Sequence, residues 1–427
     1  SSIARLRAGF DGRVIDRDDP RYDQARAVFA GGIDRFPAVI VRPTNADEVA
    51  RVVAVARDTG LELAVRSGGH SGAGHSVSEG GILLDLSQMR VIDIDVEGRT
   101  AWAETGSTAG EYTTAAAEYR LATGFGDSAS VGIGGMTLGG GVGFLARKHG
   151  LTIDDLLAAE VVTADGQTRY VDASHESDLF WAIRGGGGNF GVATRFRYRL
   201  HPLESVVGGM LVLPATPEVI GAFIAEAEAA PDELTTIANV MPAPPMPFVP
   251  AEYHGQPVIL GMMCFAGPAD QAKRALAPFR ALADPIADMV RPIRYPEMFP
   301  PDPEDYLPVS VARTSFVDSI DRAAAKLIVD RLAESSAAIA VTQLRVLGGA
   351  LARVPDDATA YAHRGRRVLV NVAAIYEPGG DTSTHLAWVT DLTAALTGGD
   401  NSGYVNFIAD EGPARVRAAY PGTPGIG

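Results

Sequence analysis

Two histidines in a glycine-rich stretch are the side chains most suited to chemistry in this sequence. The stretch reads RSGGHSGAGHS over residues 66–76, with His70 directly after Gly68 and Gly69 and His75 five residues later. Because glycine adopts backbone conformations closed to other residues, the chain can turn sharply there and present the next side chain outward. An imidazole presented in this way acts as a nucleophile or a ligand. We expect His70 to be the reactive side chain, with His75 as the alternative.

A second glycine-rich stretch, SVGIGGMTLGGGVG, covers residues 130–143. Consecutive glycines expose backbone N–H groups, which can hold phosphates or carbonyl oxygens without a buried charge. No lysine follows the glycines, so the stretch is not a P-loop. We expect a glycine loop packed against a large ligand rather than a flexible linker, because apolar residues anchor it: Val131, Ile133, Met136, Leu138, Val142 and Phe144.

A third glycine cluster, GGGGNFG, contains the spacing GxGxxG at Gly186, Gly188 and Gly191. The dinucleotide-binding fingerprint needs a strand before these glycines and a helix after them. Here the order is reversed, with the helical pattern SDLFWAIRG before and the alternating pattern GVATRFRYRL after. The cluster therefore does not predict an NAD site.

Other catalytic patterns are not found. The single cysteine, Cys264, excludes an internal disulfide and a CxxC metal site, and its apolar neighbours indicate a buried side chain. The sequence has no HExxH motif, no Ser-His-Asp order and no paired-carboxylate signature. The remaining histidines are too scattered to predict a metal site.

The first half of the chain alternates strands and helices that can position these stretches. Residues 36–71 read as strand, helix and strand, with a capping box at Thr44 and Asp47 and a helix end at Gly60. We expect strands at 61–65, 80–89 and 101–106 and a helix over 114–122. Asp165 and Gly166 predict the turn of a hairpin over 157–173, and Ser177 is the expected cap of the next helix.

The pattern changes near residue 205. From 206 to 395, helices such as 217–230 and 321–335 alternate with strands such as 257–265, 340–350 and 366–376. This order predicts an antiparallel sheet backed by helices. At 427 residues the chain is too long for one ordinary core. We expect an α+β fold with a first domain over 1–205, a second over 206–395 and a C-terminal return to the first over 396–427.

The net charge and the lengths of the apolar runs exclude some classes of binding partner. A net charge of −15 argues against nucleic acid and anionic membranes, and no apolar run reaches the length of a membrane helix. The N-terminal residues lack the apolar core of a secretory signal, so we expect a cytoplasmic protein or a secreted one whose signal has been removed. The expected partners are a small-molecule substrate and dioxygen, and the expected assembly is a monomer or homodimer.

Several of these segments together resemble one family, the berberine-bridge-enzyme-like FAD-linked oxidoreductases of the vanillyl-alcohol-oxidase superfamily, with its PCMH-type FAD-binding fold. The matching segments are RPTNADEVARVVAVAR, VRSGGHS, GGILLDLSQM, VGIGGMTLGGGVGFLARKHGLTIDDLLAAEVVTADG, DLFWAIRGGGGNFGVATRF and YVNF. They cover the first half of the chain and a short piece near its end. The segment from 206 to 395 is similar to the family only loosely.

The resemblance implies that the first domain binds FAD and that His70 is bonded to the 8α-methyl carbon of the flavin. It also implies cofactor contacts in three places. The matching positions are Arg66, Ser67, Gly68, Gly69 and Ser71 at the pyrophosphate, Gly132, Gly134, Gly135, Thr137, Gly140, Gly141 and Gly143 at the isoalloxazine, and Gly191 and Val192 at the adenine.

Three departures from the family pattern change what can be carried over. Ser128 stands where many relatives have a cysteine that makes a second flavin bond, so a single link is expected, similar to the branch of 6-hydroxy-D-nicotine oxidase. Phe407 in YVNF replaces a tyrosine base, whereas Asn406 remains able to hydrogen-bond substrate or flavin. The final residues, YPGTPGIG, replace a longer run of the family, so a truncated or altered tail is expected.

The resemblance therefore predicts removal of hydride from a substrate C–H bond to FAD, with dioxygen as the final acceptor. Val131 matches a position that is small when dioxygen reaches the flavin, which favours an oxidase. The alternatives are a flavin dehydrogenase with another acceptor and a non-catalytic flavin- or ligand-binding protein. The substrate is expected to be an amine, a sugar or another alcohol. Asn406 and Tyr376 are the candidate catalytic residues, and Asn371, Gln343 and Arg345 are further candidates on the predicted strands of the second domain.

Overall fold

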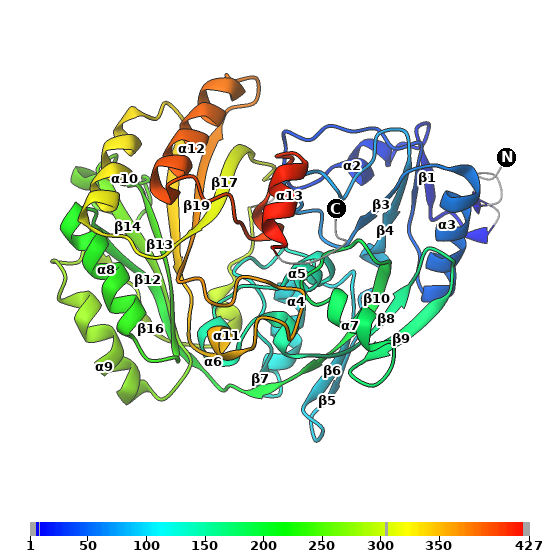
Figure 1. Ribbon diagram of the computed structural model, residues 1–427, viewed down its shortest axis with the longest axis horizontal. Coiled ribbons are helices and arrows are strands. Elements are labelled where there is room, and N and C mark those ends of the chain that lie inside the picture. Colours follow the sequence, from blue (N-terminus) through cyan, green and yellow to red (C-terminus); the bar gives the residue numbers. More distant parts are fainter. Residues whose placement is uncertain (1–5, 8, 304–305, 422–427) are drawn as a thin grey trace.

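A computed structural model describes residues 6–7, 9–303 and 306–421. Figure 1 shows two halves with separate sheets, the first half of the chain on the right and most of the second half on the left. The right half contains a four-stranded and a five-stranded sheet, and the left half contains one eight-stranded sheet. The predicted α+β fold, with an antiparallel sheet backed by helices in its second part, is confirmed.

The four-stranded sheet has the order β1-β2-β4-β3, in which β2, β4 and β3 run parallel. Its β2 and β4 are apolar and fully buried, as expected for parallel strands covered on both faces. Helix α3 packs on this sheet through Val49, Val52 and Val53. The bounds are β1 Val14–Asp16, α2 Tyr22–Arg26, β2 Val39–Val41, α3 Ala46–Thr59, β3 Leu63–Arg66, β4 Ile82–Asp85 and the 3-10 helix η1 Leu86–Gln88.

The five-stranded antiparallel sheet has the order β5-β6-β10-β8-β9, and a two-stranded ribbon pairs β11 with β7. The predicted hairpin is present as β8 and β9, with Gly166 at φ +81° in its turn. The bounds are β5 Ile92–Asp95, β6 Thr100–Glu104, α4 Ala109–Ala117, β7 Leu121–Ala122, α5 Ile133–Gly139, α6 Ala146–His149, η2 Thr152–Asp154, β8 Leu156–Val162, β9 Thr168–Asp172, α7 Ser177–Ala182, β10 Val192–Arg199 and β11 His201–Pro202.

The eight-stranded sheet has the order β15-β12-β14-β13-β18-β19-β17, with β16 also paired to β12. One face is covered by helices and the other faces the first half of the molecule. The bounds are β12 Val206–Pro214, α8 Pro217–Ala229, β13 Leu234–Pro242, η3 Ala251–Tyr253, β14 Pro257–Phe265, α9 Ala269–Arg280, β15 Ala287–Asp288, β16 Arg291–Ile293, η4 Tyr295–Met298, β17 Val309–Val317, α10 Arg322–Glu334, β18 Ile339–Val346, α11 Ala350–Arg353, β19 Val368–Tyr376 and α12 Thr382–Thr397.

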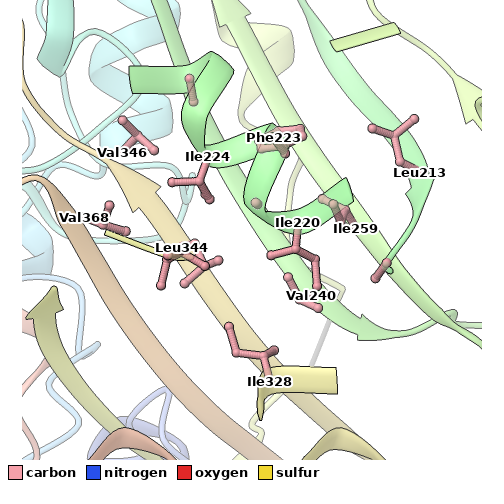
Figure 2. Close-up of a cluster of buried hydrophobic side chains, with 14 of the residues drawn as sticks. Leu213, Ile220, Phe223, Ile224, Val240, Ile259, Ile328, Leu344, Val346 and Val368 are labelled. Carbon is pink, nitrogen blue, oxygen red and sulfur yellow. The ribbon is translucent and has the colours of Figure 1, made fainter. Parts of the chain in front are cut away.

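The helix-covered face of this sheet holds the largest core. Figure 2 shows Phe223 and Ile224 of α8 and Ile328 of α10 packed on Val240 and Leu344 of the strands. Each such side chain stabilises the fold by roughly 1.5–3 kcal/mol through removal from water. The alternating apolar residues of β13, β18 and β19 turn one face of the sheet toward these helices. The residues between them therefore face the first half of the molecule.

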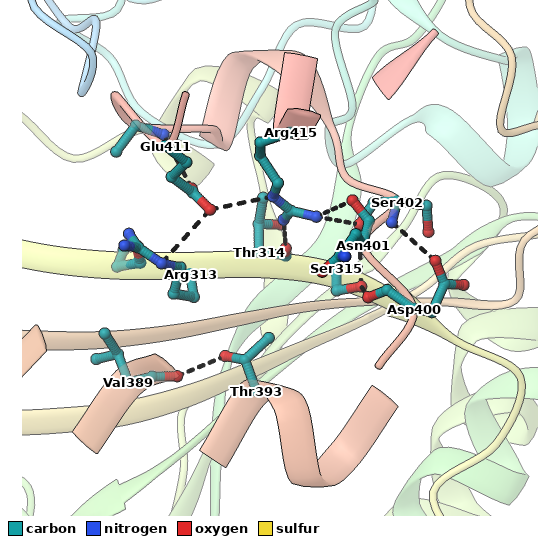
Figure 3. A network of polar contacts seen from close by, with 12 residues as sticks. Arg313, Thr314, Ser315, Val389, Thr393, Asp400, Asn401, Ser402, Glu411 and Arg415 are labelled. Atoms are coloured by element: carbon teal, nitrogen blue, oxygen red, sulfur yellow. Dashed lines mark hydrogen bonds and ion pairs between the residues drawn. The ribbon is translucent and has the colours of Figure 1, made fainter. Parts of the chain in front are cut away.

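The segment after α12 returns between the two halves, where the 3-10 helix η5 Val405–Phe407 and helix α13 Pro413–Ala419 lie. Figure 3 shows how Arg415 anchors it: its guanidinium donates to Glu411 at 3.0 Å, to the carbonyl of Ser402 at 2.9 Å and to the carbonyl of Thr314 on β17. Arg313 also pairs with Glu411 at 3.4 Å. The expected truncation concerns residues 422–427, which lie outside the described residues.

Local details differ from the sequence-based expectations at three helices. The cap of α3 is Asn45, which accepts from the N–H of Glu48, rather than Thr44 with Asp47. Helix α4 starts earlier than predicted, because Thr108 and Glu111 form its capping box, and it ends at Ala117. The cap of α7 is Glu176 in a left-handed conformation, one residue before Ser177.

The glycine stretch 130–143 is not a loop throughout, because residues 133–139 form helix α5. Glycine is a poor helix former. The helix is held instead by burial of Ile133 and Met136 in the core beneath the five-stranded sheet. We therefore correct the predicted loop to a short loop, a helix and a second loop.

Two further expectations concern Cys264 and the membrane. Cys264 is buried, as predicted, and burial raises the pKa of its thiol to about 12, which makes it an inert packing residue. Among the described helices, none has the length and apolar character needed to cross a bilayer. Within the same part of the chain, no cluster of three His, Cys, Asp or Glu side chains could hold a metal ion.

Candidate functional site

A cavity of about 400 Å³ lies at the carboxyl edge of the parallel strands in the first half. Arg42 follows the end of β2, Arg66 ends β3 and Asp85 ends β4, so the three meet at one edge. Ligands of open α/β sheets bind at this edge. The residues that line the cavity are Ala27, Val28, Phe29, Arg42, Arg66, Ser67, Gly68, His70, Asp85, Ser87, Arg90, Gly106, Thr108, Ser130 and Leu307.

Asp85 organises the charged side of the cavity. Its carboxylate accepts from Arg66 at 2.9 Å and from Arg42 at 2.8 Å. Burial alone would raise the pKa of this carboxyl, but the two arginines outweigh that effect and lower the pKa below its usual range. The Arg66 guanidinium also donates to the carbonyls of Ala25 and Ala27. Its side chain therefore holds the cavity wall together, while its backbone leads into the glycine turn.

The cavity is suited to an anion. Arg90 also lines it and pairs with Glu111, with Nε 3.3 Å from the carboxylate. Three guanidinium groups, on Arg42, Arg66 and Arg90, thus face two carboxylates, on Asp85 and Glu111. Among these five groups one positive charge is left over, which favours a ligand with a negative group such as a phosphate beside the arginines. A further carboxylate, on Asp302, is hydrogen-bonded to Ser130 in the part of the wall that holds His70.

The two glycine stretches meet in direct backbone contact beside this cavity. A Cβ on Gly68 would lie 2.2 Å from the backbone N of Gly132. Ser67 Oγ accepts from the N–H of Gly134 at 3.1 Å and donates to the carbonyl of Thr105. Gly69 has φ +77°, a conformation that permits the turn before His70. The structure therefore brings together Ser67, Gly68, Gly69, Gly132 and Gly134, which the sequence predicted as one site.

This contact predicts a large difference between two glycines of the same stretch. Gly132→Ala would put a Cβ 2.2 Å from Gly68 N and from Ser67 Oγ, so we expect the free energy of unfolding to fall by about 1–3 kcal/mol. Gly135→Ala is the control, because its Cβ would meet no atom within 4 Å and alanine favours a helix by up to about 1 kcal/mol. Denaturant unfolding of both variants checks this, and equal midpoints would contradict it.

His70 lies in the cavity wall with its ring held on two sides. Its Nε2 is 2.9 Å from Ser130 Oγ, and its ring stacks on Phe29 at 4.0 Å with 19° between the planes. Burial lowers the pKa of His70, and the nearby Asp302 carboxylate opposes this only in part. His75, in contrast, is exposed and does not line the cavity. The geometry favours His70 over His75 as the reactive histidine.

Ser71, Ser128 and Val131 were also predicted as cofactor contacts, and these roles stay predictions. Ser71 accepts from the N–H of His75 at 3.2 Å and so closes the turn after His70. Ser128 and Val131 are half-buried in the loop before α5. The carbonyl of Val131 accepts from the N–H of Ala109, which ties this loop to the start of α4.

The later glycines of the second stretch contact protein rather than the cavity. A Cβ on Gly139 would lie 2.0 Å from Asn406 Oδ1, and Gly141 donates its N–H to Tyr404 OH at 2.9 Å. Gly140 packs under the rings of Tyr361 and Tyr404, and a Cβ on Gly143 would lie 1.7 Å from the carbonyl oxygen of Phe125. The C-terminal return therefore requires a glycine at Gly139 and contributes to the contacts of Gly140, whereas the Cβ of residue 141 would meet Thr152 Oγ1 at 2.0 Å.

Thr137, Gly191 and Val192 lie away from the cavity wall. The Thr137 hydroxyl is buried and lies 2.8 Å from Tyr198 OH. Gly191 has φ +147° at the start of β10, and a Cβ there would lie 2.6 Å from the Val162 carbonyl oxygen. Val192 is buried and pairs with Val162. Their roles as cofactor contacts stay predictions.

Asn406 is held by two hydrogen bonds of its own amide. Its Nδ2 donates to the carbonyl of Met136 at 3.0 Å and to Tyr404 OH at 2.9 Å. It therefore fixes the end of α5 against the C-terminal return. Phe407 next to it packs against Tyr404, with the ring centroids 5.0 Å apart, and lies under the Arg345 guanidinium at 5.1 Å.

A polar chain crosses the sheet face that looks toward the first half. Asn239 accepts from Gln343 at 2.8 Å, and Gln343 accepts from Arg345 Nε at 2.9 Å. Arg345 then pairs with Asp127 at 2.6 Å, on the loop that leads to α5. Asn371 is opposite Gln343 on β19, and its buried Oδ1 has no partner among the described residues. The predicted Gln343, Arg345 and Asn371 therefore share one face.

Tyr376 is not brought to this face. It ends β19 on the side of Val370, Val372 and Ala374, which is covered by helices. Its hydroxyl donates to Thr382 at 2.9 Å and its ring stacks on His385 at 4.4 Å. We correct the predicted catalytic role of Tyr376: it anchors α12, because an even-numbered residue of this strand faces the helices.

Several cavity residues were missed by the sequence reasoning. Arg42 and Asp85 carried a usable signal, since charged residues directly after apolar parallel strands mark the ligand edge. Phe29 and Leu307 carried none, because they come from segments without a recognisable motif. Ser130 is the first residue of the second glycine-rich stretch, but nothing in that stretch singles it out. Phe29 and Leu307 lie far apart in sequence and meet only through the fold.

The comparisons with known proteins agree with this site. Residues 37–172 match the family model described as an FAD binding domain. Over 93% of this chain and 88% of the relative, the sequence is 29% identical to the uncharacterized FAD-linked oxidoreductase YgaK of Bacillus subtilis (strain 168). It is 35% identical to the (R)-6-hydroxynicotine oxidase of Paenarthrobacter nicotinovorans over 67% of this chain and 62% of that protein.

The fold gives the same result. The crystal structure of 6-hydroxy-D-nicotine oxidase from Arthrobacter nicotinovorans superposes with a TM-score of 0.85 at 27% identity, covering 96% of this chain and 92% of that one. Fold and cavity together define a flavin-dependent redox enzyme. The chain belongs to the berberine-bridge-enzyme-like FAD-linked oxidoreductases of the vanillyl-alcohol-oxidase superfamily.

The residues present fit FAD. The leftover positive charge near Arg42, Arg66 and Arg90 suits a pyrophosphate. The backbone contact between Gly68 and Gly132 holds the two glycine-rich stretches together beside the cavity, and Gly68 itself lines it.

Proposed function

We propose that this protein is an oxidase that removes hydride from a C–H bond of a small amine, alcohol or sugar, with FAD bonded once to the protein through His70. FAD, when bound, accepts the hydride and passes the electrons to dioxygen, which gives hydrogen peroxide. The observation that carries the proposal is the position of His70 in the wall of an anion-suited cavity, with Nε2 held by Ser130 and the ring held by Phe29.

The ionisation of His70 supports a bond to the cofactor. Because burial lowers its pKa, the imidazole is neutral at pH 7 and keeps one nitrogen lone pair. In the attachment, a bond forms between that nitrogen and the 8α carbon. One hydrogen leaves the methyl group and one leaves the imidazole, and dioxygen takes up the two electrons and two protons as hydrogen peroxide.

A single link follows from Ser128. Cysteine forms a thiolate readily, whereas a serine hydroxyl needs an adjacent base to become a nucleophile. Ser128 lies half-buried two residues before Ser130. We therefore expect one protein–flavin bond, as in the mono-covalent pattern that the sequence predicts.

The polar chain of Asn239, Gln343 and Arg345 supports a substrate site on the sheet face opposite the flavin-binding half. These side chains offer amide and guanidinium groups to a polar substrate, and Phe407 offers an apolar ring beside them. Phe407 has no ionisable group, so the base is another residue or the substrate amine reacts in its neutral form. The relative named (R)-6-hydroxynicotine oxidase makes an amine the first class to test.

The test is a bleaching screen without oxygen, followed by air. Purified yellow protein is mixed anaerobically with secondary amines, alcohols and sugars, and the flavin absorbance is followed. We expect one class to bleach it and air to restore the colour at once with formation of hydrogen peroxide. Slow recovery in air with rapid recovery by a dye acceptor would show a dehydrogenase instead. No bleaching by any class would show a flavin-binding protein without this activity.

A further inference from the structure

A segment from the second half of the chain reaches the cavity and touches the region of His70. After η4, Leu307 lines the cavity, and the carbonyl of Pro308 accepts from the N–H of Gly31 at 3.0 Å. The ring of Tyr306 lies 6.1 Å from that of Phe29, edge on. In the same segment, Asp302 accepts a hydrogen bond from Ser130. A carboxylate is thus placed one hydroxyl away from His70.

The direction of these hydrogen bonds fixes the tautomer of His70. A serine hydroxyl has one proton to donate, and an ionised carboxylate only accepts. Ser130 donates its proton to Asp302, so its oxygen must accept the bond that joins it to His70 Nε2. Nε2 therefore carries the ring proton, and the lone pair is on Nδ1.

The ring cannot easily turn to exchange these nitrogens. Phe29 stacks on one face at 4.0 Å and Ser130 holds Nε2 at 2.9 Å. Burial further keeps the ring neutral by lowering its pKa. Asp302, Ser130 and His70 thus form a chain of carboxylate, hydroxyl and imidazole. Such a chain can take the proton from one imidazole nitrogen while the other nitrogen acts as a nucleophile.

We propose that Asp302 and Ser130 form a proton relay for flavin attachment, which makes Nδ1 of His70 the nitrogen that bonds to FAD. The inference rests on the covalent link proposed above. As the Nδ1–8α carbon bond forms, a methyl C–H bond breaks and its hydrogen leaves as a proton. The Nε2 proton passes to Ser130, whose own proton passes to Asp302. The two electrons reach dioxygen, which leaves as hydrogen peroxide with two protons.

The experiment measures attachment rather than turnover. Wild type, Ser130→Ala, Ser130→Thr and Asp302→Asn are produced under riboflavin limitation, incubated with FAD in air, sampled over time and precipitated with acid. Flavin fluorescence on the denatured polypeptide gives the attachment rate, and fluorescence titration gives non-covalent FAD binding. At FAD concentrations that saturate each variant in the titration, we expect Ser130→Ala and Asp302→Asn to attach flavin about a hundredfold more slowly than wild type. Ser130→Thr keeps the hydroxyl and should attach at nearly the wild-type rate.

The outcomes separate the relay from the proposed function. Wild-type attachment rates in Ser130→Ala or in Asp302→Asn would overturn the relay, and so would a wild-type flavin peptide linked at Nε2 by nuclear magnetic resonance. If Ser130→Ala no longer binds FAD, the attachment rate of Asp302→Asn decides the question, because that variant leaves the glycine stretch intact. A wild-type protein that loses all its flavin to acid contradicts the covalent link itself, and the relay with it.

Discussion

Replacing His70 with alanine is expected to abolish acid-stable flavin completely while the chain still folds. His70 is half-buried at the cavity wall, and among the described residues its side chain is hydrogen-bonded only to Ser130, so alanine removes no core side chain. The measurement is flavin fluorescence of the acid-precipitated polypeptide. The wild type should retain its flavin, and the variant should release all of it to the supernatant.

The matched control is His75→Ala. His75 is in the same glycine turn but is exposed, and its backbone N–H rather than its ring is hydrogen-bonded. We expect this variant to keep acid-stable flavin at the wild-type level. The reverse result, with flavin released from His75→Ala and kept by His70→Ala, would show that the histidines were assigned the wrong way round. In His70→Ala, the reduction potential of the non-covalent flavin should also be lower than in wild type.

The second large effect is expected at the other wall of the cavity, where Asp85→Asn should lower the free energy of unfolding by about 3–5 kcal/mol. The change leaves Arg66 buried without its carboxylate and removes the partner of Arg42. Denaturant unfolding with and without FAD measures the loss. The control is Asp58→Asn, whose pair with Arg57 is exposed and should contribute little.

The same residue predicts a dependence of stability on pH. The pKa of Asp85 is lower in the folded protein than its ordinary value of about 3.9, so its ion pairs stabilise fully above about pH 4. That stabilisation is lost as the pH falls further, toward the pKa in the folded state. Unfolding midpoints should therefore converge between wild type and Asp85→Asn in acid. A constant difference between them down to the lowest pH would contradict this assignment.

Short-range patterns in the sequence predicted much of this fold correctly. The Asp165-Gly166 hairpin, the two strands on either side of the first glycine turn and the order of helix and strand around Gly186–Gly191 all depend on neighbouring residues. Alternating apolar residues likewise predicted the antiparallel sheet of the second half. In each case the deciding interaction is local or repeats with a fixed period.

The sequence could not show contacts between distant segments. Gly139 is a glycine because Asn406 approaches it, and that residue lies more than 260 positions away. Helix α5 forms in a glycine-rich stretch because tertiary packing outweighs a poor helix propensity. Ser130, at the start of the second glycine-rich stretch, meets Asp302 across 172 positions, and no motif around Asp302 predicts the contact.

Tyr376 is different, because the sequence did contain the information that places it. Its neighbours at two-residue spacing, Val370, Val372 and Ala374, are apolar and face the helices, whereas Asn371 faces the other half. A tyrosine in phase with the apolar residues belongs to the covered face. The alternation of side chains along this strand therefore argues against Tyr376 as a catalytic residue and in favour of Asn371.

Peptide mapping of the holoprotein by mass spectrometry tests most directly the central claim, that FAD is bonded to this chain at His70 and nowhere else. The protein as purified is digested, and every peptide is weighed and sequenced by fragmentation. We predict one flavin-modified peptide, the one that spans RSGGHSGAGHS, with the added mass on His70 and none on His75 or Ser128. Unmodified peptides throughout, or a flavin on any other residue, would contradict the account.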